Sequence, residues 1–277
     1  MPRSKKTTAV QEIIDQSGNS FHSCVVKNLR DGGWTVLVSP YYSDNFTDKP
    51  REIDIIAEKK FNVTDFVSNW LGTVNVLLFI ECKYITTATV FWFDAKDKER
   101  AIERIMRDTG MEHPQLDGNI QKHHYLSDVA VAKLFASDSK RNEDNETITK
   151  AINQNLNATV YYRNRKDLKI ATTQSGYVER VLKRVSYPII VVNSMEPFHS
   201  TDMGGSGEVH AITEPFQLEV NYAYTDKDRN GFNEYFLVDV VSIDKLSDFL
   251  ITSIEQADVP ALAEKIKWDK RLNRAQN

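Results

Sequence analysis

The chain of 277 residues contains only two cysteines, Cys24 and Cys82. Two thiols are too few for a disulfide framework in a chain of this size, and their spacing is not that of a zinc site. No apolar run reaches the ~18 residues of a membrane-spanning helix. The basic N-terminal stretch lacks the apolar segment of a secretory signal. We therefore expect a cytoplasmic protein without a membrane partner.

Net positive charge is also missing, because 35 Lys and Arg residues face 39 Asp and Glu residues and leave a formal net charge of −4. This balance argues against a purely electrostatic nucleic-acid binder but permits an enzyme with a local basic channel. The glycine-rich stretch MGGSGE does not have the pattern of a phosphate-binding P-loop. No Gly-x-Ser-x-Gly or Cys/His signature indicates a hydrolase of another type.

What is present is a mixture of helical and strand periodicities, which predicts an α/β fold. Helices are expected at 7–30, 94–108, 116–136, 147–157, 176–185 and from Asp244 onward. Strands are expected at 34–38, 51–59, 76–85, 158–162 and 187–194, and then in LEVNYAY and EYFLVDVVS. We expect the last two strands to continue one sheet, in a single domain over residues 1–277 with a polar linker near 138–147.

One predicted strand ends in charged residues. In LLFIECKYI, residues 77–85, an apolar run leads into Glu81-Cys82-Lys83. Alternate side chains share a face of a strand, so Glu81 and Lys83 point the same way and Cys82 points the other way. Asp54 lies in the preceding predicted strand, and pairing of the two strands would bring it to Glu81. Two carboxylates within ~4–6 Å repel each other unless a cation lies between them.

Oxygen ligands of this kind suit a hard divalent cation, Mg²⁺ or Mn²⁺. The backbone carbonyl of Cys82 is a candidate third ligand beside Asp54 and Glu81. Lys83 would then assist an attacking water or stabilise charge that develops on a phosphate. The structural alternative is an ion pair between Glu81 and Lys83 at a strand end, with Asp54 facing solvent. An enzyme of unrelated chemistry would place Asp54 far from Glu81.

This pattern resembles the PD-(D/E)xK nuclease superfamily, which has the restriction-endonuclease-like fold. Asp54 in REIDIIA matches the acidic position, and Glu81-Cys82-Lys83 matches E-x-K. The resemblance covers about residues 18–135. It implies a central mixed β-sheet flanked by helices, with residues 86–115 as an insertion. It also implies a metal-dependent endonuclease that hydrolyses phosphodiester bonds.

Gln121 and Tyr125 form a Q-x-x-x-Y pattern similar to the one that RecB-like members carry on the helix after the E-x-K strand. Helical i, i+4 spacing would put both residues on one face. The resemblance implies that Gln121 orients Lys83 or the scissile phosphate and that Tyr125 packs or stacks beside it. The alternative is an ordinary helix with an exposed glutamine and a half-buried tyrosine.

The chain departs from many relatives at the first helix, where His22 stands in place of a glutamate. His22 is either a surface residue or a metal ligand, and imidazole beside two carboxylates favours Mn²⁺ over Mg²⁺. Viral cap-snatching endonucleases of the superfamily look similar in using a histidine from this helix, and they cut RNA. Glu12 is the other candidate for the missing acidic ligand.

Four basic residues are candidate contacts to a nucleic-acid backbone, since such contacts supply sequence-independent affinity. They are Lys96, Arg100, Arg104 and Arg107. We expect DNA rather than RNA as substrate, in restriction, repair or a mobile element, and a homodimer would suit cleavage of both strands. The rival functions are a Mn²⁺-dependent ribonuclease that uses His22 and a catalytically silent nucleic-acid-binding or assembly module on the same fold.

Overall fold

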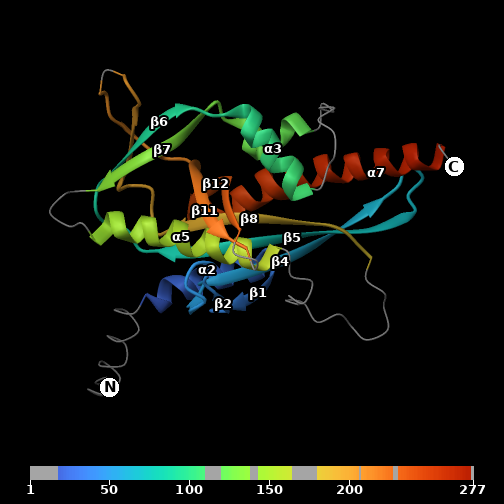
Figure 1. Cartoon of the computed structure of the whole chain (residues 1–277), viewed down its shortest axis with the longest axis horizontal. Coiled ribbons are helices and arrows are strands. Elements are labelled where there is room, and N and C mark those ends of the chain that lie inside the picture. Colours follow the sequence, from blue (N-terminus) through green and yellow to red (C-terminus); the bar gives the residue numbers. More distant parts are fainter. Residues whose placement is uncertain are drawn as a thin grey trace, which may run out of the picture.

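A ten-stranded mixed β-sheet with helices on both faces forms the centre of the chain (Figure 1). The computed structural model describes residues 18–109, 120–137, 143–163, 180–205, 207–226 and 230–275. The predicted α/β class, with a central mixed sheet flanked by helices, is confirmed. No helix among these residues is long and apolar enough to cross a membrane.

The strands follow one another across the sheet in an order that differs from their order in the chain. They are, in sheet order, β1 (Thr35–Val38), β4 (Ile55–Thr64), β5 (Trp70–Lys83), β8 (Val181–Val192), β12 (Gly231–Ser242), β11 (Phe216–Thr225), β7 (Ala130–Ser137), β6 (Thr89–Ala95), β9 (Phe198–Asp202) and β10 (His210–Ala211). A separate small sheet pairs β2 (Tyr41–Ser43) with β3 (Pro50–Glu52). LEVNYAY and EYFLVDVVS therefore do continue the central sheet, as β11 and β12.

Four long helices and several short ones accompany these strands among the described residues. They are α2 (Asn19–Asp31), α3 (Lys98–Thr109), the 3₁₀ turn η1 (Ile120–Lys122), α4 (His124–Ser127), α5 (Glu143–Arg163), α6 (Leu246–Phe249), the π-helix η2 (Leu250–Asp258) and α7 (Val259–Ala275). Apolar side chains of α2, α3 and the C-terminal helices pack on one face of the sheet. Those of α5 pack on the opposite face.

β5 is a buried strand that lies between β4 and β8 and carries most residues of the candidate site. It pairs antiparallel with β4, with Ile80 opposite Ile55, and parallel with β8, with Glu81 opposite Ile190. The apolar run of residues 77–80 is fully buried because both faces of the strand are covered. Ile80 and Cys82 join the cluster on the α2 face. Leu77 and Phe79, which alternate with these residues along the strand, face α5.

Three predicted elements differ in type from the observed ones, and the predicted strand 51–59 is divided into β3 and β4 by a bend at Asp54. Residues 116–136 are not one helix, because α4 is short and β7 follows it with the alternating burial of a strand. The predicted strand at 158–162 is the end of α5, where Ala158 and Tyr162 pack together with Phe79. The predicted helix at 176–185 overlaps the start of β8, whose pairing with β5 begins at Val181. Tertiary packing overrides local propensity in the last two cases.

The proposed linker and insertion also take part in regular structure. The last residues of the 138–147 stretch belong to α5, and 138–142 lie outside the described residues. The stretch 86–115 contains β6 and α3, and β6 pairs with β7 and β9. The helix after Asp244 begins at Leu246 with Lys245 as its N-cap, and no side chain caps it.

The strands β7, β6, β9 and β10 form an extension of the sheet that meets the rest at a narrow seam. One registered pair, Leu218 with Ala132, joins β11 to β7. Side chains on both sides of the seam nevertheless share one apolar cluster, which contains Phe91, Ala132 and Phe198 together with Leu218 and Phe236.

Candidate metal centre at the ends of β4 and β5

Asp54, Glu81 and Lys83 lie together, although Asp54 does not lie in the strand that the sequence predicted. Asp54 occupies a bend immediately before β4, and the register of β4 with β5 places it next to the Glu81–Cys82 peptide. Its Oδ2 accepts a hydrogen bond of 2.8 Å from the backbone N–H of Cys82. The same oxygen lies 3.8 Å from Lys83 Nζ. This separation excludes the arrangement in which Asp54 is remote from the E-x-K residues.

Glu81 is the most deeply buried member of the site, with a fully inaccessible side chain. Its Oε2 accepts a 2.7 Å hydrogen bond from Lys83 Nζ. Its Oε1 is also buried and has no hydrogen-bond partner among the described residues. Burial, with a further contribution from Asp54, raises the pKa of Glu81 to about 8 despite the neighbouring lysine. The ionised carboxylate is costly to bury unless something positive binds it, so without a cation Glu81 keeps its proton at neutral pH.

Lys83 bridges the two carboxylates. Burial lowers the pKa of its amine, but the charges of Glu81 and Asp54 outweigh burial and leave the pKa raised. The ammonium is therefore protonated at neutral pH. About 18% of the Lys83 side chain remains exposed, so the amine can meet a ligand that arrives from solvent.

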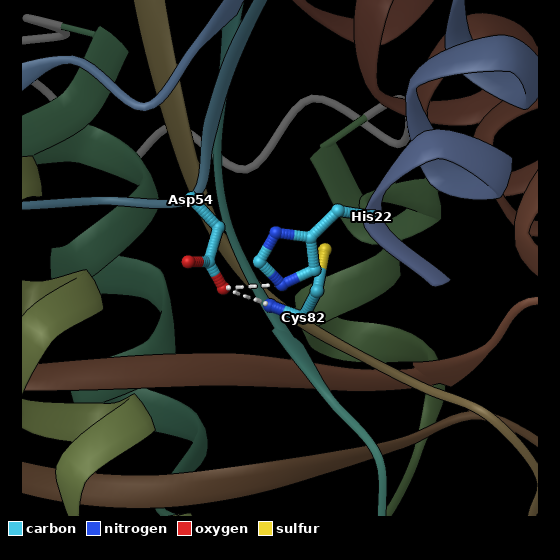
Figure 2. Close-up of side chains that lie close together, drawn as sticks. All are labelled: His22, Asp54 and Cys82. Carbon is cyan, nitrogen blue, oxygen red and sulfur yellow. Dashed lines mark hydrogen bonds and ion pairs between the residues drawn. The ribbon is translucent and has the colours of Figure 1, made fainter. Parts of the chain in front are cut away.

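His22 joins the site from α2. Its Nε2 lies 3.5 Å from Asp54 Oδ2. Figure 2 marks this contact with a dashed line. The ring nitrogen, an Asp54 oxygen and the Cys82 sulfur all lie within 4.8 Å of one another. The sequence left two alternatives for His22, a metal ligand or a surface residue. The structure places it beside Asp54. Glu12 lies outside the described residues.

The Cys82 thiol is a member of this group that the sequence analysis missed, because only its backbone carbonyl was considered. The alternation of β5 turns its sulfur toward His22 and away from Glu81. Burial raises the pKa of the thiol well above its ordinary value, with Asp54 adding to the effect. The thiol is therefore protonated at neutral pH, which leaves imidazole and carboxylates as the ready donors.

The predicted Q-x-x-x-Y pair does not join this centre. The helix breaks at His123, so Gln121 lies in η1 and Tyr125 in α4 instead of one turn apart on one helix. Gln121 is exposed, whereas Tyr125 is buried and its hydroxyl donates to the Leu237 carbonyl. Tyr125 packs in the cluster on the α2 face, opposite the face to which Glu81 points. The i, i+4 expectation was wrong because it assumed a continuous helix.

The basic residues around α3 are largely occupied inside the molecule. Arg104 is buried and forms ion pairs with Asp108 and Glu234, so it is not the surface contact that the sequence suggested. Lys96 donates to the Gln217 side chain and the Tyr125 carbonyl. Arg100 donates to Asn221 and lies over the ring of Tyr235. Arg107 is well exposed, with Glu234 at 3.3 Å.

A second polar cluster is buried at the start of α4. His123 and His124 stack and both face Asp258, because His123 is extended and does not belong to the helix. His124 contacts Asp258 through Nδ1 and Asp239 through Nε2, and these two charges raise its pKa to about 10 against the effect of burial. His123 accepts the Tyr125 N–H through Nδ1, so its neutral ring carries the proton on Nε2. Protonated His124 thus satisfies this cluster without a metal ion.

No family model, curated protein or solved structure matches this chain. The resemblance to the nuclease superfamily therefore consists of the residues of the centre and the strands that carry them. Asp54 before β4 and the E-x-K end of β5 keep the predicted order, and α2 with His22 precedes them.

Proposed function

We propose that the chain is a metal-dependent nuclease that hydrolyses phosphodiester bonds. The observation that carries the proposal is the convergence of Asp54, Glu81 and Lys83, with one Glu81 oxygen buried and unpartnered. The order of α2, β1, β4 and β5 supports a restriction-endonuclease-like core, with β6 to β7 as an insertion before the next long helix, α5.

The donor set fits a divalent cation. Two carboxylates and an imidazole are present, and the unpartnered Glu81 Oε1 has the free lone pairs that a cation needs. Oxygen donors suit Mg²⁺ or Mn²⁺, and His22 shifts the preference toward Mn²⁺. When bound, such a cation supplies a Lewis acid that stabilises negative charge on a phosphate.

The remaining roles fall to this chain's own side chains. Lys83 is held by Glu81 and Asp54 with its amine charged, so it can hold an attacking water or stabilise charge on the scissile phosphate. Asp54 is fixed by the Cys82 N–H, which orients its carboxylate toward both His22 and Lys83. The substrate we propose is DNA in preference to RNA.

The test is cleavage of plasmid DNA, single-stranded DNA and RNA in Mg²⁺, Mn²⁺ or EDTA, by the wild-type chain and by Lys83→Ala. We expect cleavage that requires the metal and falls at least ~10²-fold in the variant, because a general acid–base or electrostatic contribution of this kind is lost. Lys133→Ala is the matched control, since Lys133 is also a partly buried strand lysine paired with a carboxylate, Asp94. It should cleave as the wild type does.

Two results would contradict the proposal. Metal-dependent cleavage that persists in a folded Lys83→Ala variant would remove Lys83 from the chemistry. No cleavage of any substrate, with equal nucleic-acid binding by both proteins, would favour a catalytically silent binding or assembly module.

The position of His22 favours a second candidate, a Mn²⁺-dependent ribonuclease. His22 Nε2 faces Asp54 Oδ2, where it would complete a nitrogen-containing ligand set. His22→Ala would then lose activity in Mn²⁺ more than in Mg²⁺, and RNA would be the better substrate of the wild type.

A further inference from the structure

An exposed tyrosine stands directly beside the proposed centre. Tyr84 follows Lys83 at the end of β5, and 67% of its surface is open to solvent. Its ring meets Phe21 edge to face, with ring centroids 6.4 Å apart, and Phe21 is the neighbour of His22 in α2. This contact positions the ring of Tyr84 beside the site without burying it.

A second exposed tyrosine lies where the chain passes Asp54. The Ser39 N–H donates to the Asp54 carbonyl, and the Ile53 N–H donates to the Pro40 carbonyl. These two hydrogen bonds hold the start of β2 against the residues of the site. Tyr41, the next residue, is 66% exposed.

A single exposed aromatic ring is ordinary on a protein surface, so the position of these two tyrosines next to the centre is what points to a ligand. Tyr84 and Tyr41 are also the two most exposed aromatic side chains of the described residues. Unpaired nucleobases stack on exposed tyrosines, whereas the bases of a duplex are already stacked on one another. Phosphate contacts offer less here, because the chain has a net charge of −4 and Lys96, Arg100 and Arg104 are engaged internally. The features next to the site therefore match a single strand better than a duplex.

We propose that Tyr84, together with Tyr41 near Asp54, stacks on unpaired bases of a single-stranded nucleic acid whose backbone enters the Asp54–Glu81–Lys83 centre. This inference rests on the proposed nuclease function and names the class of its substrate. The shared chemistry is the unpaired base, so single-stranded DNA and RNA are both tested.

The experiment measures the binding of labelled single-stranded DNA, single-stranded RNA and duplex DNA by fluorescence anisotropy, in EDTA so that no cleavage occurs. Tyr84→Ala should weaken single-strand binding by about 5- to 150-fold, the effect of losing one base–aromatic stack. Tyr84→Phe keeps the ring and should bind almost as the wild type does. Tyr41→Ala should weaken binding in the same direction.

Phe66→Ala is the matched control, because Phe66 is an exposed aromatic residue at the opposite end of β5, in the turn between β4 and β5. It should leave binding unchanged. The dependence of binding on salt should be the same in the wild type and Tyr84→Ala, since stacking releases no counterions from phosphate.

Unchanged single-strand binding by Tyr84→Ala, or an equal loss for duplex DNA, would overturn the inference. Failure of the wild type to bind any of the three probes would do so as well. These results are distinct from the test of the proposed function, because the proposed function is overturned only if metal-dependent cleavage is absent or independent of Lys83. If the wild type cleaves nucleic acid while Tyr84→Ala binds it normally, the nuclease proposal stands and the stacking proposal is overturned.

Discussion

Glu81 carries a carboxylate that is removed from solvent, with one oxygen bound to Lys83 and the other without a partner. Such a group weakens the folded state when no cation is bound, because the unfolded chain hydrates it fully. The raised pKa of about 8 expresses the same cost, since the folded state keeps a proton on Glu81 that the unfolded state releases near pH 4.5. The cation binding that we propose for Glu81 and the stability of the metal-free fold are therefore opposed.

Glu81→Gln should stabilise the protein in EDTA, by about 1–3 kcal/mol at pH 8. Between pH 4.5 and 8 the folded wild type binds more protons than the unfolded chain, so its stability falls as pH rises through this window. The variant lacks this loss, and the gap between the two should be small at pH 4.5. Urea unfolding across this pH range measures it.

Added Mn²⁺ provides the counterpart of this measurement. It should raise the unfolding temperature of the wild type and leave Glu81→Gln unchanged, because ligand binding to the folded state alone stabilises it. A wild type whose stability in EDTA follows the same pH course as the variant would show that Glu81 is not strained by burial.

At the residue scale, the sequence was sufficient wherever strand geometry decides. The two-residue period of β5 puts Glu81 and Lys83 on one face, and antiparallel pairing then brings Asp54 to them. The sequence was insufficient where a break in a helix decides which residues share a face. Nothing in QKHHY shows that the backbone of His123 is extended. The burial of Arg104 was equally hidden, since its partner Glu234 lies 130 residues further along the chain.

At the scale of elements, β5 passes close to the start of β8 at Gly72. Its φ of +144° suits glycine, and a Cβ at this position would lie 2.4 Å from the Arg180 carbonyl oxygen. The β5–β8 register shifts between Thr73 and Val74, next to this close approach, and then continues regularly to Glu81 beside Ile190. Local propensity predicted a helix over the first residues of β8. It could not show that these residues pair with β5, because that pairing exists only in the folded sheet.

Gly72→Ala should destabilise the protein by about 1–3 kcal/mol, because the backbone must move apart to accept a methyl group. Gly231→Ala is the control, since a Cβ there meets no atom within 4 Å. Chemical denaturation of both variants measures the difference. Equal stability of the two would mean that the sheet opens at Gly72 without cost.

At the scale of the whole molecule, Glu234 of β12 connects helices from both faces of the sheet. It accepts from Arg104 of α3 and Arg163 of α5, and Tyr224 of β11 donates to it as well. Burial raises the pKa of Glu234, but the arginines outweigh burial and lower the pKa to about 2. Its ionised form therefore stabilises the assembled fold.

Glu234→Gln should lower stability at neutral pH by roughly 2–3 kcal/mol, because buried Arg104 and half-buried Arg163 lose the negative charge that they share, and Arg104 keeps only Asp108 as an ion-pair partner among the described residues. The depressed pKa means that the wild-type contribution is complete above pH 4.5 and is lost as pH falls toward 2. The difference in unfolding free energy between wild type and variant should shrink over this acid range. A difference that stays constant down to pH 2 would contradict the assignment.

The seam between β11 and β7 has a mechanical consequence. A continuous ladder resists separation with many backbone hydrogen bonds, but here one registered pair, Leu218 with Ala132, joins the extension to the rest. A force applied across the sheet would meet its weakest resistance at this line. The extension would then part from β11 as one piece, held until that moment by side-chain packing, while the paired strands β4, β5 and β8 that carry the centre stay joined.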